Sequence, residues 1–127
     1  MSDPPRDPPS LPPDGPERRA SDRFDVTWSV DCTTEDTFLY AAISNISQMG
    51  IFVRTTEPLA IGTRLSLRFA APEAGTFDLQ GVVSWVNPVR ENGDNPNPGM
   101  GIRFLDLSPD DRERIVEVIH TIAYVRS

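Results

Sequence analysis

The architecture of this chain follows from Phe24-Asp25-Val26-Thr27-Trp28-Ser29-Val30-Asp31-Cys32-Thr33, where apolar and polar side chains alternate without interruption. Successive side chains of a β-strand point to opposite faces, so this period of two predicts a strand with one buried face and one solvent-exposed face. A single strand of this kind cannot cover its own apolar face. The rest of the chain must therefore supply further strands.

The same alternation recurs in five later segments. We expect strands at 38–46, 51–55, 65–69, 77–86 and 100–105, joined by polar turns and with no helical pattern between them. This arrangement predicts an all-β domain, a six-stranded antiparallel barrel or sandwich. The alternation also places Trp28 and Trp85 on apolar faces, so we expect both indoles to pack in the core rather than to stack on a base.

The end of the chain changes to a helical period. Ser108 is a typical N-cap, Pro109 suits the first helical position, and two aspartates follow in the first turn. Isoleucines then recur on one helical stripe. We therefore predict one C-terminal helix at 109–124 that packs on the barrel, with a last turn that could contact a second copy in a homodimer. His120 has no partner at metal-ligand spacing, so we expect it to be structural.

The start of the chain is rich in proline. Residues 1–17 hold seven of the thirteen prolines and hardly any apolar side chains. Such a segment buries too little surface to offset the entropy of ordering it. We predict a disordered N-terminal tail at 1–17, followed by one domain at 18–127.

Composition narrows the classes of function. The 19 acidic and 12 basic residues give a net charge of −7, which argues against binding of nucleic acid or anionic membrane by the whole surface. No run approaches the roughly 18 apolar residues of a membrane span, so no membrane insertion is expected. The single Cys32 favours a reducing compartment, hence a cytoplasmic protein. The sequence contains no recognisable Ser/His/Asp or Cys/His arrangement for nucleophilic catalysis. We therefore expect neither an enzyme nor a cofactor.

Two polar segments combine into a candidate binding site. Arginines cluster just before the first strand, and a turn of the form Asn-x-Ser-x-x-Gly separates the second strand from the third. The candidate residues are Arg18, Arg19, Arg23, Asn45, Ser47 and Gly50. One guanidinium group can donate two parallel hydrogen bonds, either to two phosphate oxygens or to N7 and O6 of guanine. The set therefore indicates a ligand with both phosphate and base. The alternative is a solvated charge cluster beside a turn that its own side chains stabilise.

Within the turn, the alternation places Asn45 and Ser47 on the same side of the chain and Ile46 on the other. We expect Gly50 to adopt a positive φ that lets the chain reverse. Two further arginines, Arg54 and Arg103, lie on predicted strands. They are weaker candidates for the site, and we expect both to be ordinary exposed side chains.

Arg-x-x-x-Arg at 19–23 followed by Asn-x-Ser-x-x-Gly at 45–50 resembles the paired signature of the PilZ domain, a small bacterial β-barrel receptor for cyclic di-GMP. The likeness continues through Gly81–Val86 and Pro98–Phe104 and covers residues 18–124. It implies a PilZ-like six-stranded barrel that binds cyclic di-GMP and signals to an unidentified protein partner. By the same resemblance, Arg18, Arg19 and Arg23 would grip phosphate and guanine, Asn45 and Ser47 would bond base or phosphate, and Gly50 would shape the turn.

Two other functions remain open from the sequence. A PilZ-like adaptor would bind no nucleotide and would act by protein contact in motility or polarity. A small barrel that binds single-stranded nucleic acid is disfavoured by the acidic composition and by aromatic residues that alternate inward.

Overall fold

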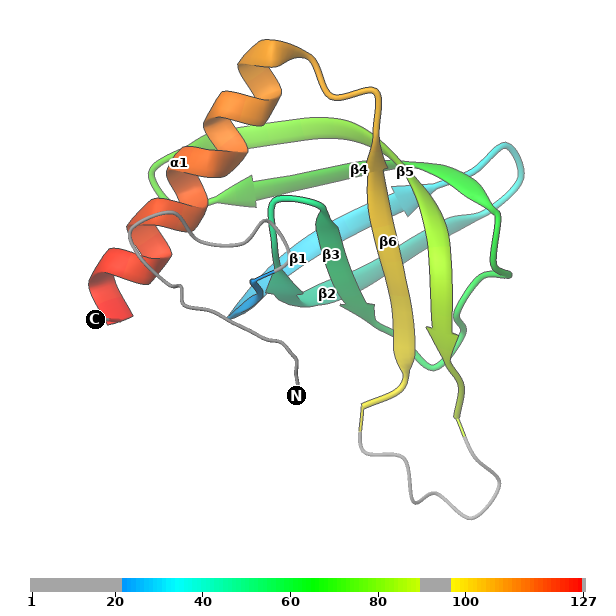
Figure 1. Cartoon of the computed structure of the whole chain (residues 1–127). Helices are drawn as coiled ribbons and strands as arrows, with labels where there is room; N and C mark the ends of the chain where they lie inside the picture. Colours follow the sequence, from blue (N-terminus) through cyan, green and yellow to red (C-terminus); the bar gives the residue numbers. More distant parts are fainter. Residues whose placement is uncertain (1–21, 90–96, 127) are drawn as a thin grey trace, which may run out of the picture.

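The computed structural model describes residues 22–89 and 97–126, so the predicted tail at 1–17, Arg18 and Arg19 lie outside the described residues. The described elements are six strands and one helix (Figure 1). In chain order they are β1 (Phe24–Thr33), β2 (Phe38–Ile46), β3 (Gly50–Arg54), β4 (Arg64–Ala71), β5 (Gly75–Asn87), β6 (Gly99–Leu105) and α1 (Pro109–Arg126).

The strands form a closed barrel in the order β1-β2-β3-β6-β5-β4, with every neighbouring pair antiparallel. The pairing of β1 with β4, from Val30 opposite Phe69 to Thr33 opposite Ser66, closes the ring. The predicted fold class, an all-β antiparallel barrel with one C-terminal helix, is confirmed. Strand β5 is longer than predicted and begins at Gly75.

The barrel interior is filled by the apolar positions of each alternating strand. In β4 burial alternates without a break, with Leu65, Leu67 and Phe69 inside. Cys32 lies in the same core, where loss of hydration and then the charge of Asp31 raise its pKa to about 12. Its thiol therefore stays neutral and unreactive near neutral pH.

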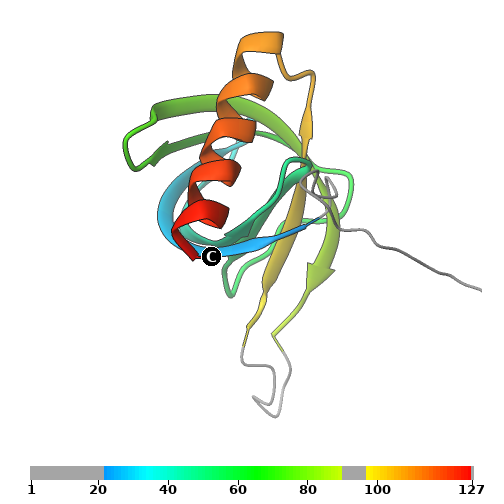
Figure 2. The same cartoon turned by 60° about the vertical axis from the view of Figure 1, so that its left-hand side comes forward.

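Helix α1 begins at the predicted proline and lies against one end of the barrel (Figures 1 and 2). Ser108 acts as the N-cap, since its Oγ accepts a hydrogen bond of 3.0 Å from the Asp111 amide. Ile115, Val118 and Ile119 join the barrel core, whereas Tyr124 and Val125 are exposed. No helix in the described ranges is long and apolar enough to cross a membrane.

Three strand pairs contain a register shift: β1/β2 between Asp25 and Trp28, β2/β3 between Ile43 and Asn45, and β5/β6 between Val83 and Trp85. A bulge adds one residue to a strand and can turn the next side chain to the other face. This explains why the prediction of a core Trp85 was wrong. Val83 is buried, Ser84 is the extra residue, and Trp85 is 50% exposed on the outside of the barrel.

The expected positive φ at Gly50 was also wrong. Among the described glycines, only Gly62 and Gly75 have a positive φ. Gly50 instead allows β3 to approach β6, because a Cβ at this position would overlap the carbonyl oxygen of Ile102. The glycine is required by close packing of two backbones rather than by the reversal of the chain.

Arg114 ties α1 to the β4–β5 turn. Its Nη2 donates to the carbonyl oxygens of Ala74 at 2.8 Å and Thr76 at 3.0 Å. The guanidinium carbon lies 4.0 Å from the centre of the Phe77 ring. A charged donor on two backbone acceptors and an aromatic face anchors the first half of the helix.

We expect Arg114→Ala to lower the free energy of unfolding by about 1–3 kcal/mol, because it removes charged hydrogen bonds and a cation–π contact together. Urea unfolding measures this value. Arg112→Ala, an equal charge change at an exposed position of the same helix, should cost less than about 0.5 kcal/mol. Equal losses in the two variants would contradict the anchoring role.

Candidate functional site

Arg23 reaches from the start of β1 to the turn between β2 and β3. Its Nε donates to Asn45 Oδ1 at 2.6 Å, and its Nη1 donates to Ser47 Oγ at 3.3 Å. The two segments meet because Phe24 pairs with Ile46 across β1 and β2. Arg23, Asn45 and Ser47, which the sequence placed in one site, are therefore in contact in the folded chain.

Ser47 is fully buried and organises the turn. Its Oγ accepts hydrogen bonds from the amides of Met49 at 3.1 Å and Gly50 at 3.2 Å, and donates to the Gly50 carbonyl at 3.4 Å. The Phe104 amide donates to the carbonyl of Met49 at 2.9 Å, which attaches the same turn to β6. The hydroxyl is thus surrounded by backbone groups and by Arg23.

The surroundings of Arg23 favour an anionic ligand. Arg23 is exposed as a residue, but part of its guanidinium is covered, and this loss of hydration lowers its pKa. Among the described residues, Asn45 and Ser47 use two of the N–H donors of Arg23, which leaves other donors of the guanidinium for a ligand. A partly dehydrated cation with spare donors gains more from an anion than a fully hydrated one does.

A hollow of about 120 Å³ lies beside Arg23 on the outside of the barrel. Its wall combines the β2–β3 turn with the facing parts of β5 and β6. The lining residues are Arg23, Met49, Gly50, Ile51, Ser84, Trp85, Gly101, Ile102 and Arg103. Two of these described residues are arginines and none is a carboxylate, in a chain whose net charge is −7.

Two large side chains of this wall, Arg103 and Trp85, were not in the predicted site. Arg103 is exposed, as predicted, but it lies opposite Gly50 on β3 and so faces the site. Trp85 is turned outward by the bulge at Ser84. The alternation of Met100, Ile102 and Phe104 could have indicated that Arg103 points outward, but only the strand order reveals its neighbours.

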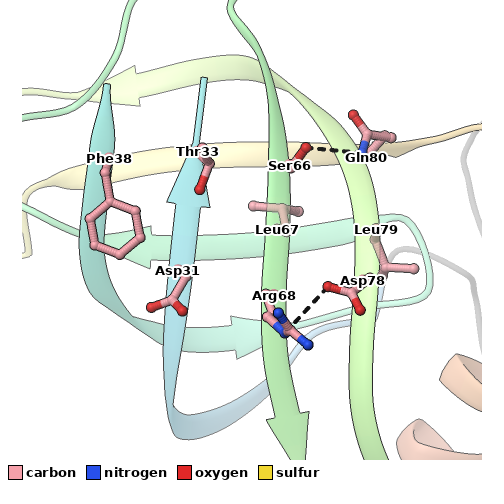
Figure 3. Close-up of a pocket in the computed structure, with 9 residues that line it drawn as sticks. All are labelled: Asp31, Thr33, Phe38, Ser66, Leu67, Arg68, Asp78, Leu79 and Gln80. Atoms are coloured by element: carbon pink, nitrogen blue, oxygen red, sulfur yellow. Dashed lines mark hydrogen bonds and ion pairs between the residues drawn. The ribbon is translucent and has the colours of Figure 1, made fainter. Parts of the chain in front are cut away.

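A second and larger hollow, of about 430 Å³, lies on the outer surface over β1, β4 and β5 (Figure 3). Its arginine, Arg68, is already paired with Asp78 at 3.5 Å, and Gln80 donates to Ser66 at 3.0 Å. Asp31 adds a further negative charge to this wall. These groups suit an anionic ligand less well than the hollow beside Arg23.

The chain belongs to the PilZ domain family, since the model of that family matches residues 17–120. The match includes both polar segments of the site. The comparison with curated protein sequences gave no match.

Solved structures agree with this assignment of the fold. The PilZ domain of YcgR from Escherichia coli with c-di-GMP superposes with a TM-score of 0.68 at 17% identity, covering 87% of this chain and 95% of that domain. The MrkH–c-di-GMP complex of K. pneumonia gives 0.67 at 19% identity, over 85% of this chain and 52% of MrkH. The Bacillus subtilis inhibitor of motility MotI/DgrA gives 0.62 at 22% identity, over 83% of this chain and 51% of MotI.

Removal of the buried hydroxyl tests the structural role of Ser47. We expect Ser47→Ala to lower the free energy of unfolding by about 1–3 kcal/mol, because it leaves buried backbone donors without their acceptor. Ser66→Ala is the control, since Ser66 is exposed and bonds only the exposed Gln80 side chain among the described residues. It should change stability by less than about 0.5 kcal/mol in the same denaturant titration.

Proposed function

We propose that this PilZ-domain protein is a receptor for cyclic di-GMP and transmits binding to a protein partner through a change of its surface. The observation that carries the proposal is the placement of Arg23, held by Asn45 and Ser47 at the edge of a hollow that contains a second arginine. The c-di-GMP complexes of YcgR and MrkH, which share the fold, support the choice of ligand. No catalytic step and no cofactor are part of the proposal.

Each residue of the site has a separate role in this proposal. Arg23 presents its free N–H donors to phosphate or to the guanine edge. Asn45 fixes the orientation of the Arg23 guanidinium by accepting a hydrogen bond from its Nε. The amide nitrogen of Asn45, which donates to no described residue, faces the base in this proposal. Ser47 acts indirectly, because its hydroxyl is buried in the turn and bonded to Arg23. Gly50 keeps the turn close to β6.

Arg18 and Arg19 lie outside the described residues, and we propose that they complete the grip on phosphate from the segment that precedes Arg23. The hollow of about 120 Å³ is smaller than the roughly 300–1,000 Å³ of pockets that enclose drug-sized ligands. A dinucleotide would therefore insert one part and lie across the outer surface. In this proposal Arg18 and Arg19 would bind the part of the ligand that stays outside the hollow.

Transmission to a partner needs a surface that the ligand can alter. The site adjoins β6, through the bond from Phe104 to Met49, and β6 leads directly into α1. The end of α1 exposes Tyr124 and Val125, at 82% and 73%. We propose this end as a contact for the partner or for a second copy of the chain. The proposal places the protein in the cytoplasm, where a buried, reduced Cys32 is stable.

The alternative is an adaptor that acts by protein contact without nucleotide, and the structural similarity to an inhibitor of motility favours keeping it. Calorimetric titration of the purified chain with cyclic di-GMP separates the two functions. Saturable binding supports the receptor. A titration that releases or absorbs no heat of binding at saturating cyclic di-GMP supports the adaptor.

We expect Arg23→Ala to weaken cyclic di-GMP binding by roughly ten- to hundred-fold or more, because it removes charge-assisted hydrogen bonds to the ligand. Arg19→Ala should have a similar effect. Both are measured by the same calorimetric titration, with thermal unfolding as a check that the Arg23→Ala variant loses no more than about 1 kcal/mol of stability.

Arg68→Ala is the matched control, because it makes the same charge change in the other hollow (Figure 3). It should bind cyclic di-GMP almost as the unaltered chain does. If Arg68→Ala and Arg23→Ala weakened binding equally, diffuse electrostatic attraction would explain the affinity, and the site beside Arg23 would be wrong.

A further inference from the structure

Two aromatic side chains project from the outer face of β2. Phe38 and Tyr40 are 64% and 66% exposed, and they are two residues apart, so both lie on the same face of the strand. Phe38 lines the hollow of about 430 Å³ over β1, β4 and β5 (Figure 3). The hydroxyl of Tyr40 donates a hydrogen bond of 2.9 Å to Ser29. Single apolar residues are common on protein surfaces, but an aromatic pair beside a hollow is typical of a surface that contacts another molecule.

The strand register places charged side chains beside this pair. Asp31 on β1 is the partner of Tyr40 on β2 and of Arg68 on β4. Arg68 is in turn the partner of Asp78 on β5. Partners across antiparallel strands share a face of the sheet, so these four side chains form one row on the outside of the barrel. The next row begins at Phe38 and continues through uncharged residues of the other three strands, Thr33, Ser66 and Gln80.

This surface has an excess of negative charge. Arg68 is paired with Asp78 at 3.5 Å, whereas the half-buried Asp31 has no ion-pair or hydrogen-bond partner among the described residues. The turn between β1 and β2 adds two exposed acidic residues, Glu35 and Asp36. The hollow and this turn thus combine four carboxylates with one guanidinium among the described residues. Such a surface attracts a cation and repels an anion.

The charge also decides which molecule fits this surface. A second copy of the chain brings a net charge of −7, and residues 1–17 contain one arginine and four acidic residues, so both would meet like charge. A partner segment that presents an arginine or lysine has the complementary charge. Because Asp31 and Phe38 line the same hollow, such a side chain can bond the carboxylate while its cationic group or its alkyl stem lies against the ring.

We propose that the outer face of β2, β1, β4 and β5 is a docking surface for a protein partner, which binds it through a segment with an arginine or lysine beside an apolar residue. Asp31 binds the cation, and Phe38 and Tyr40 cover the apolar residue. The hollow of this surface shares no residue with the hollow beside Arg23. The docking surface is also distinct from the end of α1. It therefore goes beyond the proposed receptor function and requires no nucleotide.

The test is nuclear magnetic resonance of the full chain, isotope-labelled on nitrogen, in the absence of nucleotide. The probes are two short capped peptides, one of alternating arginine and valine and one of alternating glutamate and valine. The arginine peptide should shift the amide signals of Asp31, Thr33 and Ser66 and leave those of Ser47 and Gly50 unchanged. The glutamate peptide should shift neither set. Binding of the arginine peptide should weaken as the salt concentration rises, because the contact contains exposed charges.

Two pairs of variants locate the contact. Asp31→Asn should weaken binding of the arginine peptide by roughly tenfold or more, because it removes a charge-assisted hydrogen bond. Glu113→Gln, the same charge change at an exposed position of α1, should bind normally. Phe38→Ser should weaken binding by roughly two- to thirty-fold through loss of the ring. Tyr124→Ser removes an exposed ring from α1 and should have no effect. Thermal unfolding checks that all four variants fold.

Several outcomes would overturn the docking surface. The first is the absence of shifts at the hollow with about 1 mM arginine peptide. Equal weakening by Asp31→Asn and Glu113→Gln would indicate diffuse attraction to an acidic protein. Shifts at the hollow that depend on the concentration of the chain alone, and that Phe38→Ser abolishes, would assign the surface to a second copy. Shifts at the same amides in Arg6→Ala would assign it to the N-terminal segment. The receptor function is decided separately, by the titration with cyclic di-GMP.

Discussion

A small closed barrel has room inside for the side chains of only one face of each strand, so every strand must keep its apolar residues in phase with the interior. In this chain β1 and β4 keep that phase throughout, and three strand pairs contain a register shift. All three lie next to residues of the candidate site: one follows Arg23, one precedes Asn45 and one precedes Trp85. The shifts in β2 and β5 fall directly before Asn45 and Trp85, where a bulge can turn the next side chain to the outer face.

The resulting site is small and locally positive in an acidic protein. Arg23 is fixed by two side chains of the β2–β3 turn, so little side-chain freedom remains to be lost when an anion binds. The turn itself is held by the buried Ser47 and by β6. These contacts therefore determine where the guanidinium points, and in a chain with a net charge of −7 an anion would have to be held by such local contacts rather than by long-range attraction.

Much of this arrangement could be predicted from the sequence, because strand periodicity and the cap of α1 are local properties. All six strands and the start of the helix were found in this way, and the resemblance to PilZ domains brought Arg23, Asn45 and Ser47 into one site. The orientation of Trp85 could not be predicted, since one extra residue in β5 reverses the face and no local residue type signals it. The role of Gly50 depends on Ile102, a partner on a distant strand.

The contact between Trp85 and Gly101 restricts how the sequence can change over time. Any residue with a Cβ at position 101 would overlap the indole, so Gly101 cannot be replaced while Trp85 stays in place. The reverse order is open, because a smaller residue at 85 frees the space above Gly101. A side chain at position 101 therefore requires that the indole move or that a smaller residue replace it, and we expect sequences that keep the indole in this position to keep the glycine as well.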